Sequence, residues 1–287
     1  MSDNRIQSTA PSRPVWVDSP LPEPVTASAD WIAAAAPWTC RGEDGDRCDW
    51  YHGAWQYLRL MDVVSNPGWH SRFFIEAMRA HAAPSGPTRV LVSGSADYSM
   101  YAHALAALGE QLDCDVLDWC PTPLAASAWY ARHSLATPPA LICGDAGQHA
   151  PDGEYAVIVS DSFLPRFAPD ALNTLLRAWR RALSDGGAAV TTARIHTPES
   201  GSAGARRTRA TDWTRTALDS RRWWTAVSSV PVDVVADLAS TFAARQERNA
   251  VYAQEELEEL FRRAGFEEVS CEVVDIYGKQ FARVIAR

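Results

Sequence analysis

Residues 89–120, RVLVSGSADYSMYAHALAALGEQLDCDVLDWC, have the pattern of a strand, a tight turn, a helix and a second strand. Val90 to Val92 are an apolar run, and the small residues Ser93 to Ala96 follow, so the backbone can turn sharply and approach a ligand. Asp118 ends the second strand, 24 positions after Gly94, and this spacing suits a carboxylate that binds ribose hydroxyls. The stretch predicts a nucleotide-binding unit, although an aspartate at such a place can also simply cap a loop.

The helix inside this stretch has one apolar face. Met100, Ala104 and Leu108 recur at helical spacing, and Asp97 or Ser99 can cap the first turn. A helix of this kind can pack on a sheet through that face.

Strand and helix patterns alternate through the rest of the chain. We expect strands at 90–92, 116–117, 140–143, 155–159, 188–194, 268–274 and 280–285, and helices at 50–64, 69–81, 124–136, 170–183 and 253–264. Such alternation predicts an α/β fold with a doubly wound, mostly parallel seven-stranded sheet that ends in an antiparallel hairpin. Ligands bind such sheets at the carboxyl ends of the strands.

The chain divides by composition into three parts. Residues 1–49 are predicted to be a partly disordered arm, residues 50–85 a helical cap, and residues 86–287 the α/β domain. An insertion over about 196–250 is either a lid or a packing or dimer element. The aromatic helix from Trp50 includes Tyr51 and His52, which can face a pocket or can belong to the core.

Charge and cysteine usage exclude several classes of function. The net charge of −8, without a basic stripe, argues against a nucleic-acid partner. No apolar run approaches the ~20 residues of a membrane span, and no signal sequence is evident, so we expect a cytoplasmic protein without a membrane partner. The six cysteines form no CxxC pair and have no histidine at ligand spacing, which favours structural thiols and no metal.

Over residues 50–287 the order of these parts resembles the class I S-adenosylmethionine (SAM)-dependent methyltransferases. The similarity lies in the glycine turn Ser93–Ala96, the acid Asp118, the Gly-Asp-Ala and Asp-Ser-Phe-Leu segments after the third and fourth strands, and the closing helix and hairpin. The resemblance implies a Rossmann-like methyltransferase fold with SAM as cofactor. Val92, Ala96 and Tyr98 depart from the family pattern, because an acid and two glycines are usual at these positions.

The resemblance also implies roles for individual residues. The backbone from Gly94 to Ala96 would contact the methionine part of SAM, Asp118 the ribose, and Asp145 with Ala146 the adenine. Asp161 to Phe163 would line the sulfonium end. The implied SAM-binding residues are Gly94, Ser95, Ala96, Asp97, Asp118, Asp145, Ala146, Asp161, Ser162 and Phe163.

Three functions are compatible with this sequence. The first is methyl transfer to a small-molecule substrate, with Tyr51 and His52 as candidate catalytic residues, in a chain that could form a homodimer. The second is cyclisation of SAM itself to a small-ring amino acid with release of methylthioadenosine. The third is an NAD(P)-dependent oxidoreductase, although the turn lacks two of the three glycines of the GxGxxG motif.

Overall fold

The computed structural model describes residues 23–42, 47–149, 151–195, 211–212, 215, 229–245 and 252–287. Residues 1–22 of the predicted arm lie outside this part of the chain, as does most of the predicted insertion, including its Trp213, Trp223 and Trp224. Within the described residues, no helix has the length and hydrophobicity needed to cross a membrane.

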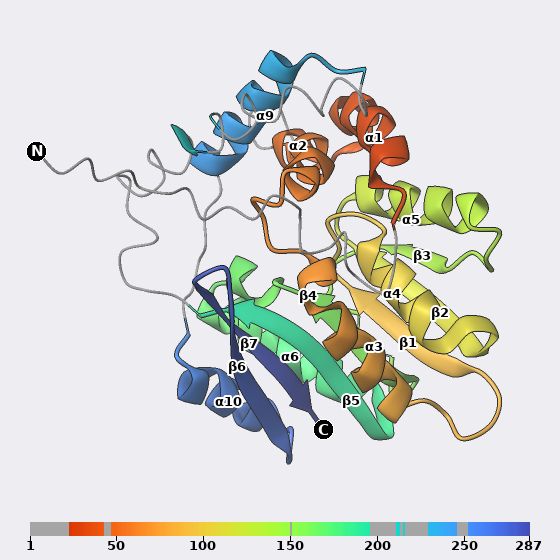
Figure 1. The fold of residues 1–287 in the computed structure, drawn as a ribbon. Helices are drawn as coiled ribbons and strands as arrows, with labels where there is room; N and C mark the ends of the chain where they lie inside the picture. Colours follow the sequence, from red (N-terminus) through yellow and green to blue (C-terminus); the bar gives the residue numbers. More distant parts are fainter. Residues whose placement is uncertain are drawn as a thin grey trace, which may run out of the picture.

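The centre of the fold is one seven-stranded sheet in the order β3-β2-β1-β4-β5-β7-β6 (Figure 1). Its strands are β1 (Thr88–Ser93), β2 (Leu112–Asp118), β3 (Ala140–Cys143), β4 (Tyr155–Asp161), β5 (Leu183–Arg194), β6 (Val269–Ile276) and β7 (Lys279–Ala286). Strands β1 to β5 pair in parallel, whereas β7 pairs antiparallel with both β5 and β6. The predicted doubly wound sheet with a C-terminal hairpin is confirmed.

Helices cover both faces of the sheet, because successive strand residues point to opposite sides. Val90 and Val92 of β1 pack with α3 (Ser71–Ala80), α4 (Ser99–Leu108) and α5 (Pro121–His133). Leu91, between them, packs with α6 (Pro169–Ala182) and α10 (Gln254–Arg263) on the other side. Both sides of β1 are therefore buried, which explains why its sequence is a continuous apolar run.

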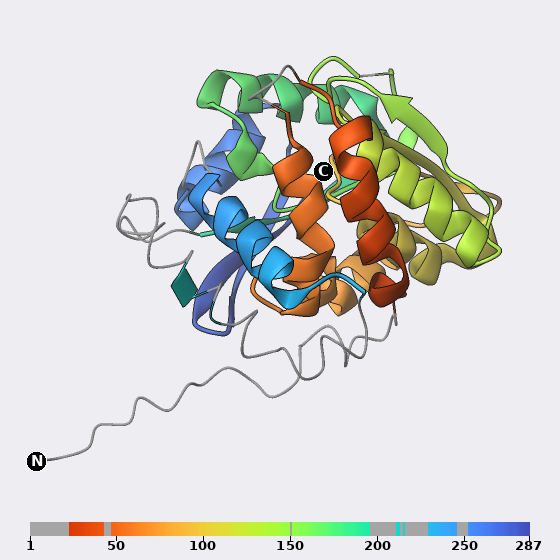
Figure 2. The same cartoon turned by 90° about the horizontal axis from the view of Figure 1, so that it is seen from above.

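Three helices form a cap at one end of the sheet. They are α1 (Val25–Thr39), α2 (Asp49–Leu60) and α9 (Val232–Arg245), with α2 between the other two (Figure 2). Trp55 and Leu58 of α2 share an apolar cluster with Phe242 of α9. Helix α9, which falls within the predicted insertion, thus packs against α2.

The cap differs in two ways from the sequence prediction. Helix α1 falls within the predicted arm, yet its Val25, Ala29, Ile32 and Ala36 are buried at helical spacing. Helix α3 was assigned to the cap with α2, but it follows a 3-10 helix (Pro67–His70) and packs on the sheet beside α4. The composition did not indicate this helix, because a segment rich in proline and serine precedes it and Pro37 lies inside it.

Candidate active site

A cavity of about 780 Å³ lies between the cap and the carboxyl ends of β1, β2 and β4. This volume falls within the ~300–1,000 Å³ range of small-molecule sites. Both predicted catalytic residues and eight of the ten predicted SAM-binding residues line it: Tyr51, His52, Gly94, Ser95, Ala96, Asp97, Asp118, Asp161, Ser162 and Phe163. The sheet topology brings the strand-end residues together, because parallel strands end at one edge, whereas Tyr51 and His52 come from α2 of the cap.

Asp145 and Ala146 are the two predicted SAM-binding residues that do not line this cavity. Asp145 is exposed, and its carboxylate accepts hydrogen bonds from the Gly147 backbone N–H at 2.8 Å and from the Gln148 side chain at 3.0 Å. Ala146 is buried in the core beneath α6. In this conformation Asp145 closes the turn after β3.

Asp118 is held in place by the backbone at the end of β2. Its Oδ2 accepts from the Ser95 N–H at 2.8 Å, and its Oδ1 accepts from the Cys120 N–H at 2.7 Å. Burial raises the pKa of the carboxyl to about 7, and these two hydrogen bonds oppose the rise. Each oxygen keeps a lone pair for a ligand hydroxyl.

Gly94 adopts a left-handed conformation, with φ of +74°. Its N–H donates to the Leu117 carbonyl at 2.9 Å, which fixes the turn against β2. A Cβ at this position would lie 2.6 Å from the Phe163 ring. The glycine is therefore required by the close approach of Phe163 as well as by the turn.

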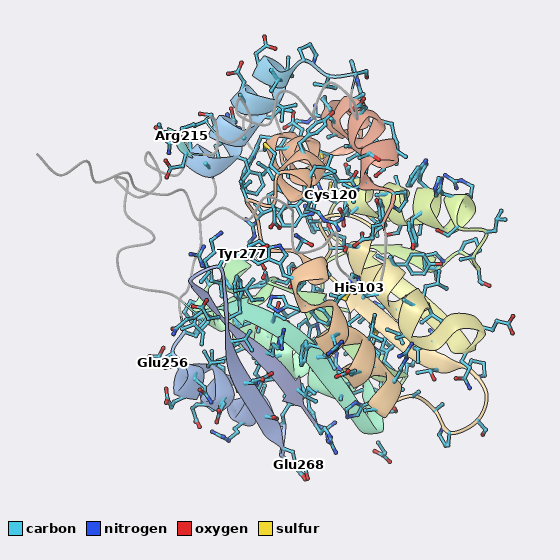
Figure 3. All side chains as sticks on the ribbon, viewed as in Figure 1. His103, Cys120, Arg215, Glu256, Glu268 and Tyr277 are labelled. Carbon is cyan, nitrogen blue, oxygen red and sulfur yellow. The ribbon has the colours of Figure 1, made fainter. Side chains whose placement is uncertain are left out.

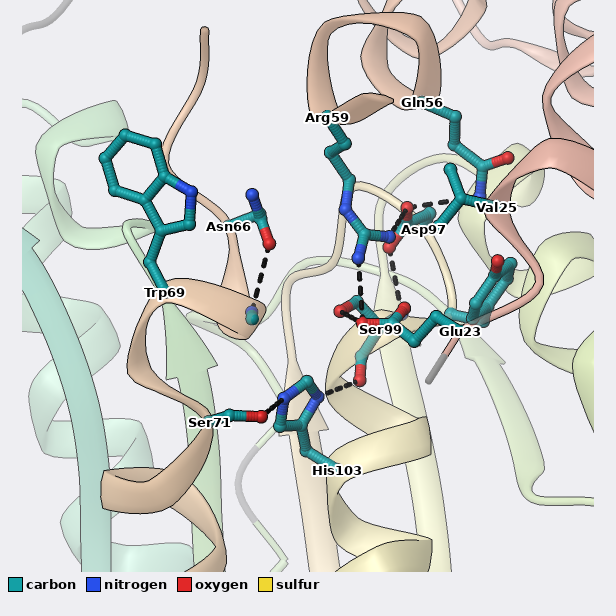
Figure 4. A network of polar contacts seen from close by, with 12 residues as sticks. Glu23, Val25, Gln56, Arg59, Asn66, Trp69, Ser71, Asp97, Ser99 and His103 are labelled. Carbon is teal, nitrogen blue, oxygen red and sulfur yellow. Dashed lines mark hydrogen bonds and ion pairs between the residues drawn. The ribbon is translucent and has the colours of Figure 1, made fainter. Parts of the chain in front are cut away.

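Asp97 lines the cavity but is already bound by the cap (Figure 4). Its Oδ2 lies 2.6 Å from Arg59 Nη1 and accepts from Gln56 at 3.2 Å, and its Oδ1 accepts from the Ser99 N–H at 2.9 Å. Arg59 also pairs with Glu23 at 2.8 Å, and these side chains are almost completely buried. Asp97 thus joins α2 to the start of α4, and its role here is to hold the cap.

Asp161 and Ser162 form the wall at the end of β4. The Thr192 hydroxyl donates to Asp161 Oδ1, and burial raises the pKa of Asp161 to about 6. Ser162 has a φ of +50°, and its N–H donates to the Thr192 carbonyl at 3.1 Å. Among the described residues, neither Ser162 Oγ nor Trp55 Nε1 finds a hydrogen-bond partner, and both residues line the cavity.

Tyr51 lies within a group of aromatic rings. Its ring stacks on Trp55 at 5.4 Å and on Phe242 at 5.1 Å, and the Arg166 guanidinium lies 4.6 Å from its centroid. Burial raises the pKa of Tyr51, while Arg166 lowers it. The phenol is neutral near pH 7.

His52 is buried beneath the turn that follows β1. Its Nδ1 lies 3.4 Å from the Ala96 carbonyl oxygen. Burial lowers the pKa of the imidazole to about 4, so the ring is neutral near pH 7. With Nδ1–H donating to Ala96, the lone pair is on Nε2.

The sequence analysis missed three basic residues of the cavity wall, Arg166, Arg194 and Lys279. Arg166 follows the predicted strand-end segment Asp161–Leu164 closely, which is a signal that could have identified it. Arg194 ends β5, and Lys279 begins β7 and lies 5.2 Å from the Trp69 ring centroid. Only the sheet order places the last two beside the cavity.

Three of the cysteines lie close to one another beside the cavity. Cys40, Cys48 and Cys120 lie together with His52, with one ligand atom from each residue within 4.8 Å of those of the others. The sequence analysis predicted structural thiols and no metal, and the convergence of three thiols on one histidine is a feature that the spacing of the cysteines along the chain did not indicate. The spacing of Cys48 and His52, one helical turn apart, is the signal that could have revealed part of the cluster.

The sequence matches no family model and no curated protein, whereas many solved structures have a similar fold. The SAM-dependent methyltransferase SibL superposes with a TM-score of 0.51 at 16% identity, over 92% of this chain and 70% of SibL. PigF, solved with S-adenosylhomocysteine (SAH), superposes with a TM-score of 0.50 at 17% identity, over 92% of this chain and 69% of PigF. The CurJ carbon methyltransferase superposes with a TM-score of 0.53 at 12% identity, over 83% of this chain and 60% of the CurJ chain.

These comparisons and the sheet order define the class of fold. The chain has the Rossmann-like fold of the class I SAM-dependent methyltransferases, as the resemblance in the sequence implied. At these identities the likeness establishes the fold alone, so the reaction is argued from the cavity.

Proposed function

We propose that the protein binds SAM in this cavity and transfers its methyl group to a small molecule. The observation that carries the proposal is the placement of Asp118 and Asp161 in one enclosed cavity at the carboxyl ends of β2 and β4. Bound SAH in PigF, which has the same fold, supports SAM as the ligand.

The cavity residues fit the chemistry of SAM. Asp118 would accept hydrogen bonds from the ribose hydroxyls through its remaining lone pairs, and these donors would favour the ionised carboxylate. Ser162 Oγ and Trp55 Nε1 supply further polar groups that have no partner among the described residues. The ring of Phe163 can stabilise a sulfonium cation by ~0.5–2 kcal/mol, whereas the Tyr51 ring already has the Arg166 guanidinium over it.

SAM supplies an electrophilic methyl group, so the protein has chiefly to position the acceptor. We assign this role to Tyr51, whose ring is fixed by Trp55 and Phe242 and whose neutral phenol can hydrogen-bond to an acceptor. Arg166, Arg194 and Lys279 add positive charge to the wall, which suits an acceptor with an anionic group. His52, the other predicted catalytic residue, lies among Cys40, Cys48 and Cys120.

Calorimetric titration of the purified protein with SAM and SAH tests the proposed site. Asp118→Asn should weaken SAM binding about tenfold or more, because hydrogen bonds to a charged group contribute ~1.5–3 kcal/mol. Asp113→Asn is the matched control, since Asp113 lies at the opposite end of β2 and pairs with Arg89. Equal affinity in both variants, or stabilisation by NAD(P) and not by SAM, would refute the assignment.

Product analysis separates methyl transfer from cyclisation of SAM. The protein is incubated with SAM alone and with SAM plus a panel of small carboxylate-bearing acceptors. SAH that forms only when an acceptor is present supports methyl transfer. Methylthioadenosine that is released without an acceptor, faster than in a protein-free control, would instead establish the cyclising reaction.

A further inference from the structure

Four side chains with metal-binding atoms converge where the cap meets the sheet. Cys40 directly follows α1, Cys48 directly precedes α2, His52 lies in the first turns of α2, and Cys120 stands between β2 and α5. Figure 3 shows Cys120 below α2, at the junction of cap and sheet. The cluster thus joins the segment from Cys40 to His52 to Cys120, which lies 72 positions after Cys48.

We propose that Cys40, Cys48, His52 and Cys120 bind one zinc ion that fastens the cap to the α/β domain. Three cysteines with one histidine are a donor set of structural zinc sites. Four protein ligands close the tetrahedron and leave no position for substrate, so this metal would be structural. The inference does not depend on the proposed methyl transfer.

The geometry is close to that of a tetrahedral site. The Sγ atoms of Cys48 and Cys120 lie 3.5 Å apart. Two thiolates on one tetrahedral zinc are about 3.8 Å apart when the Zn–S distance is ~2.3 Å, whereas a disulfide requires ~2.05 Å. All four ligand atoms lie within 4.8 Å of one another, so small side-chain rotations can bring them around one ion.

The surroundings supply the outer contacts that zinc sites have. The Thr122 hydroxyl lies 3.0 Å from Cys40 Sγ and 3.5 Å from Cys120 Sγ, where it can donate to a thiolate. The Ala96 carbonyl can accept from His52 Nδ1–H and so leave Nε2 as the ligand atom. Cys40, His52 and Cys120 are 7%, 5% and 2% exposed and Cys48 is half-buried, so little of the site faces bulk water, although Cys48, His52 and Cys120 also border the cavity.

A single disulfide accounts for the cluster less well. It would use two of the three sulfur atoms and leave the third thiol and the imidazole buried beside it. A zinc ion binds all four groups, including Cys48 and His52, which are four positions apart at the start of α2. It also explains why the buried His52 faces sulfur atoms.

Metal content of the purified full-length chain provides the first test. Protein produced with zinc in the medium and purified without chelators should contain about one zinc per chain by mass spectrometry of the elements. After removal of the metal under reducing conditions, titration with Co²⁺ should saturate at about one equivalent. The Co²⁺-loaded protein should show the visible absorption of tetrahedral cobalt together with a thiolate-to-cobalt charge-transfer band. Wild-type protein that takes up neither metal would overturn the proposal.

Matched variants identify the ligands. Cys120→Ser and Cys40→Ser should lose most of the zinc, and Cys271→Ser, a change outside the cluster, should retain it. His52→Ala should weaken cobalt binding at least tenfold, whereas His52→Cys should restore a four-ligand site and shift the charge-transfer band. Equal zinc content in Cys120→Ser and Cys271→Ser, or a disulfide among Cys40, Cys48 and Cys120 in freshly purified protein, would contradict the assignment.

Neither test requires SAM, so the metal site and the proposed function can fail separately. The cobalt titration uses the wild-type chain and stays informative if a cysteine variant does not fold.

Discussion

Gly94 shows how a single residue serves both the turn and the packing of the site. Its φ of +74° is one that L-residues adopt only at a cost, and the missing Cβ makes room for Phe163. The sequence pattern predicted the turn at Gly94. The space that it leaves for Phe163 depends on the end of β4 lying beside the end of β1.

Gly94→Ala should therefore destabilise the protein by more than the cost of placing an alanine at a positive φ. Gly186→Ala is the matched control, because Gly186 has the same φ of +74° and a Cβ there would meet nothing within 4 Å. We expect Gly94→Ala to lower the free energy of unfolding by ~1–3 kcal/mol more than Gly186→Ala, the cost of overpacking. Urea denaturation followed by fluorescence measures the difference.

A double-mutant cycle tests whether the Phe163 ring causes the extra destabilisation by Gly94→Ala. In a Phe163→Ala background, Gly94→Ala should cost no more than Gly186→Ala. If the extra cost persists without Phe163, the clash is not its cause.

At the scale of one element, α2 connects the cap to the sheet through two faces of the same helix. Tyr51, Trp55 and Leu58 face the apolar cluster that includes α9. His52, Gln56 and Arg59, each one position later, face the turn and the start of α4. Their i, i+4, i+7 spacing makes both faces continuous, so the helix carries aromatic groups to the cavity and polar groups to the domain below.

Arg59→Met should destabilise the cap strongly. The substitution removes the cation but leaves the carboxylates of Asp97 and Glu23 buried, a loss that costs ~3–5 kcal/mol. The control is Arg72→Met on α3, because the Arg72–Glu76 pair is exposed and such pairs contribute less than ~1 kcal/mol. Chemical denaturation monitored by tryptophan fluorescence compares the two.

Addition of Asp97→Asn to Arg59→Met should recover part of the loss, since one of the uncompensated charges is removed. Similar stabilities for Arg59→Met and Arg72→Met would show that the buried network does not hold the cap.

At the scale of the whole molecule, two buried clusters hold the layers of the α/β domain, and a third holds the cap above the cavity.

His70 belongs to the contact between the 3-10 helix and β7. Its ring meets Phe281 edge-on at 5.2 Å, and its Nδ1 accepts a long hydrogen bond from Arg283 Nε at 3.4 Å. Burial and the Arg283 charge lower the pKa of His70 to about 3.

This pKa predicts a loss of stability in acid. Between pH 6.5 and about 3 the unfolded chain binds a proton at His70 that the native chain does not, so the contribution of neutral His70 is complete above pH 6.5 and declines as the pH falls. His70→Gln should remove up to ~1.4 kcal/mol per pH unit from the slope of unfolding free energy against pH in that window. Urea titrations at several pH values measure the slope.

His133→Gln is the control for this measurement, because His133 is exposed on α5. It shows how much of any change in slope comes from replacing a histidine as such. If His70→Gln retains the wild-type slope, His70 does not contribute to the acid loss.

The sequence by itself determined the alternation of strands and helices in the α/β domain, the closing hairpin and the acids at the ends of β2 and β4. These features are encoded locally, in runs of apolar residues at strand or helix spacing and in the residues that end them. For the same reason it indicated the edge of the sheet at which the cavity lies, since parallel strands present their carboxyl ends together.

Only the tertiary structure decided which of those residues reach the cavity and what else each one contacts. It assigned Asp97 to the buried pair with Arg59, left Asp145 exposed outside the cavity, and placed Phe163 against Gly94. It also brought Cys120 to Cys48 and His52. The physical reason is that these contacts depend on how the cap docks on the sheet, and docking joins residues whose local sequence carries no sign of one another.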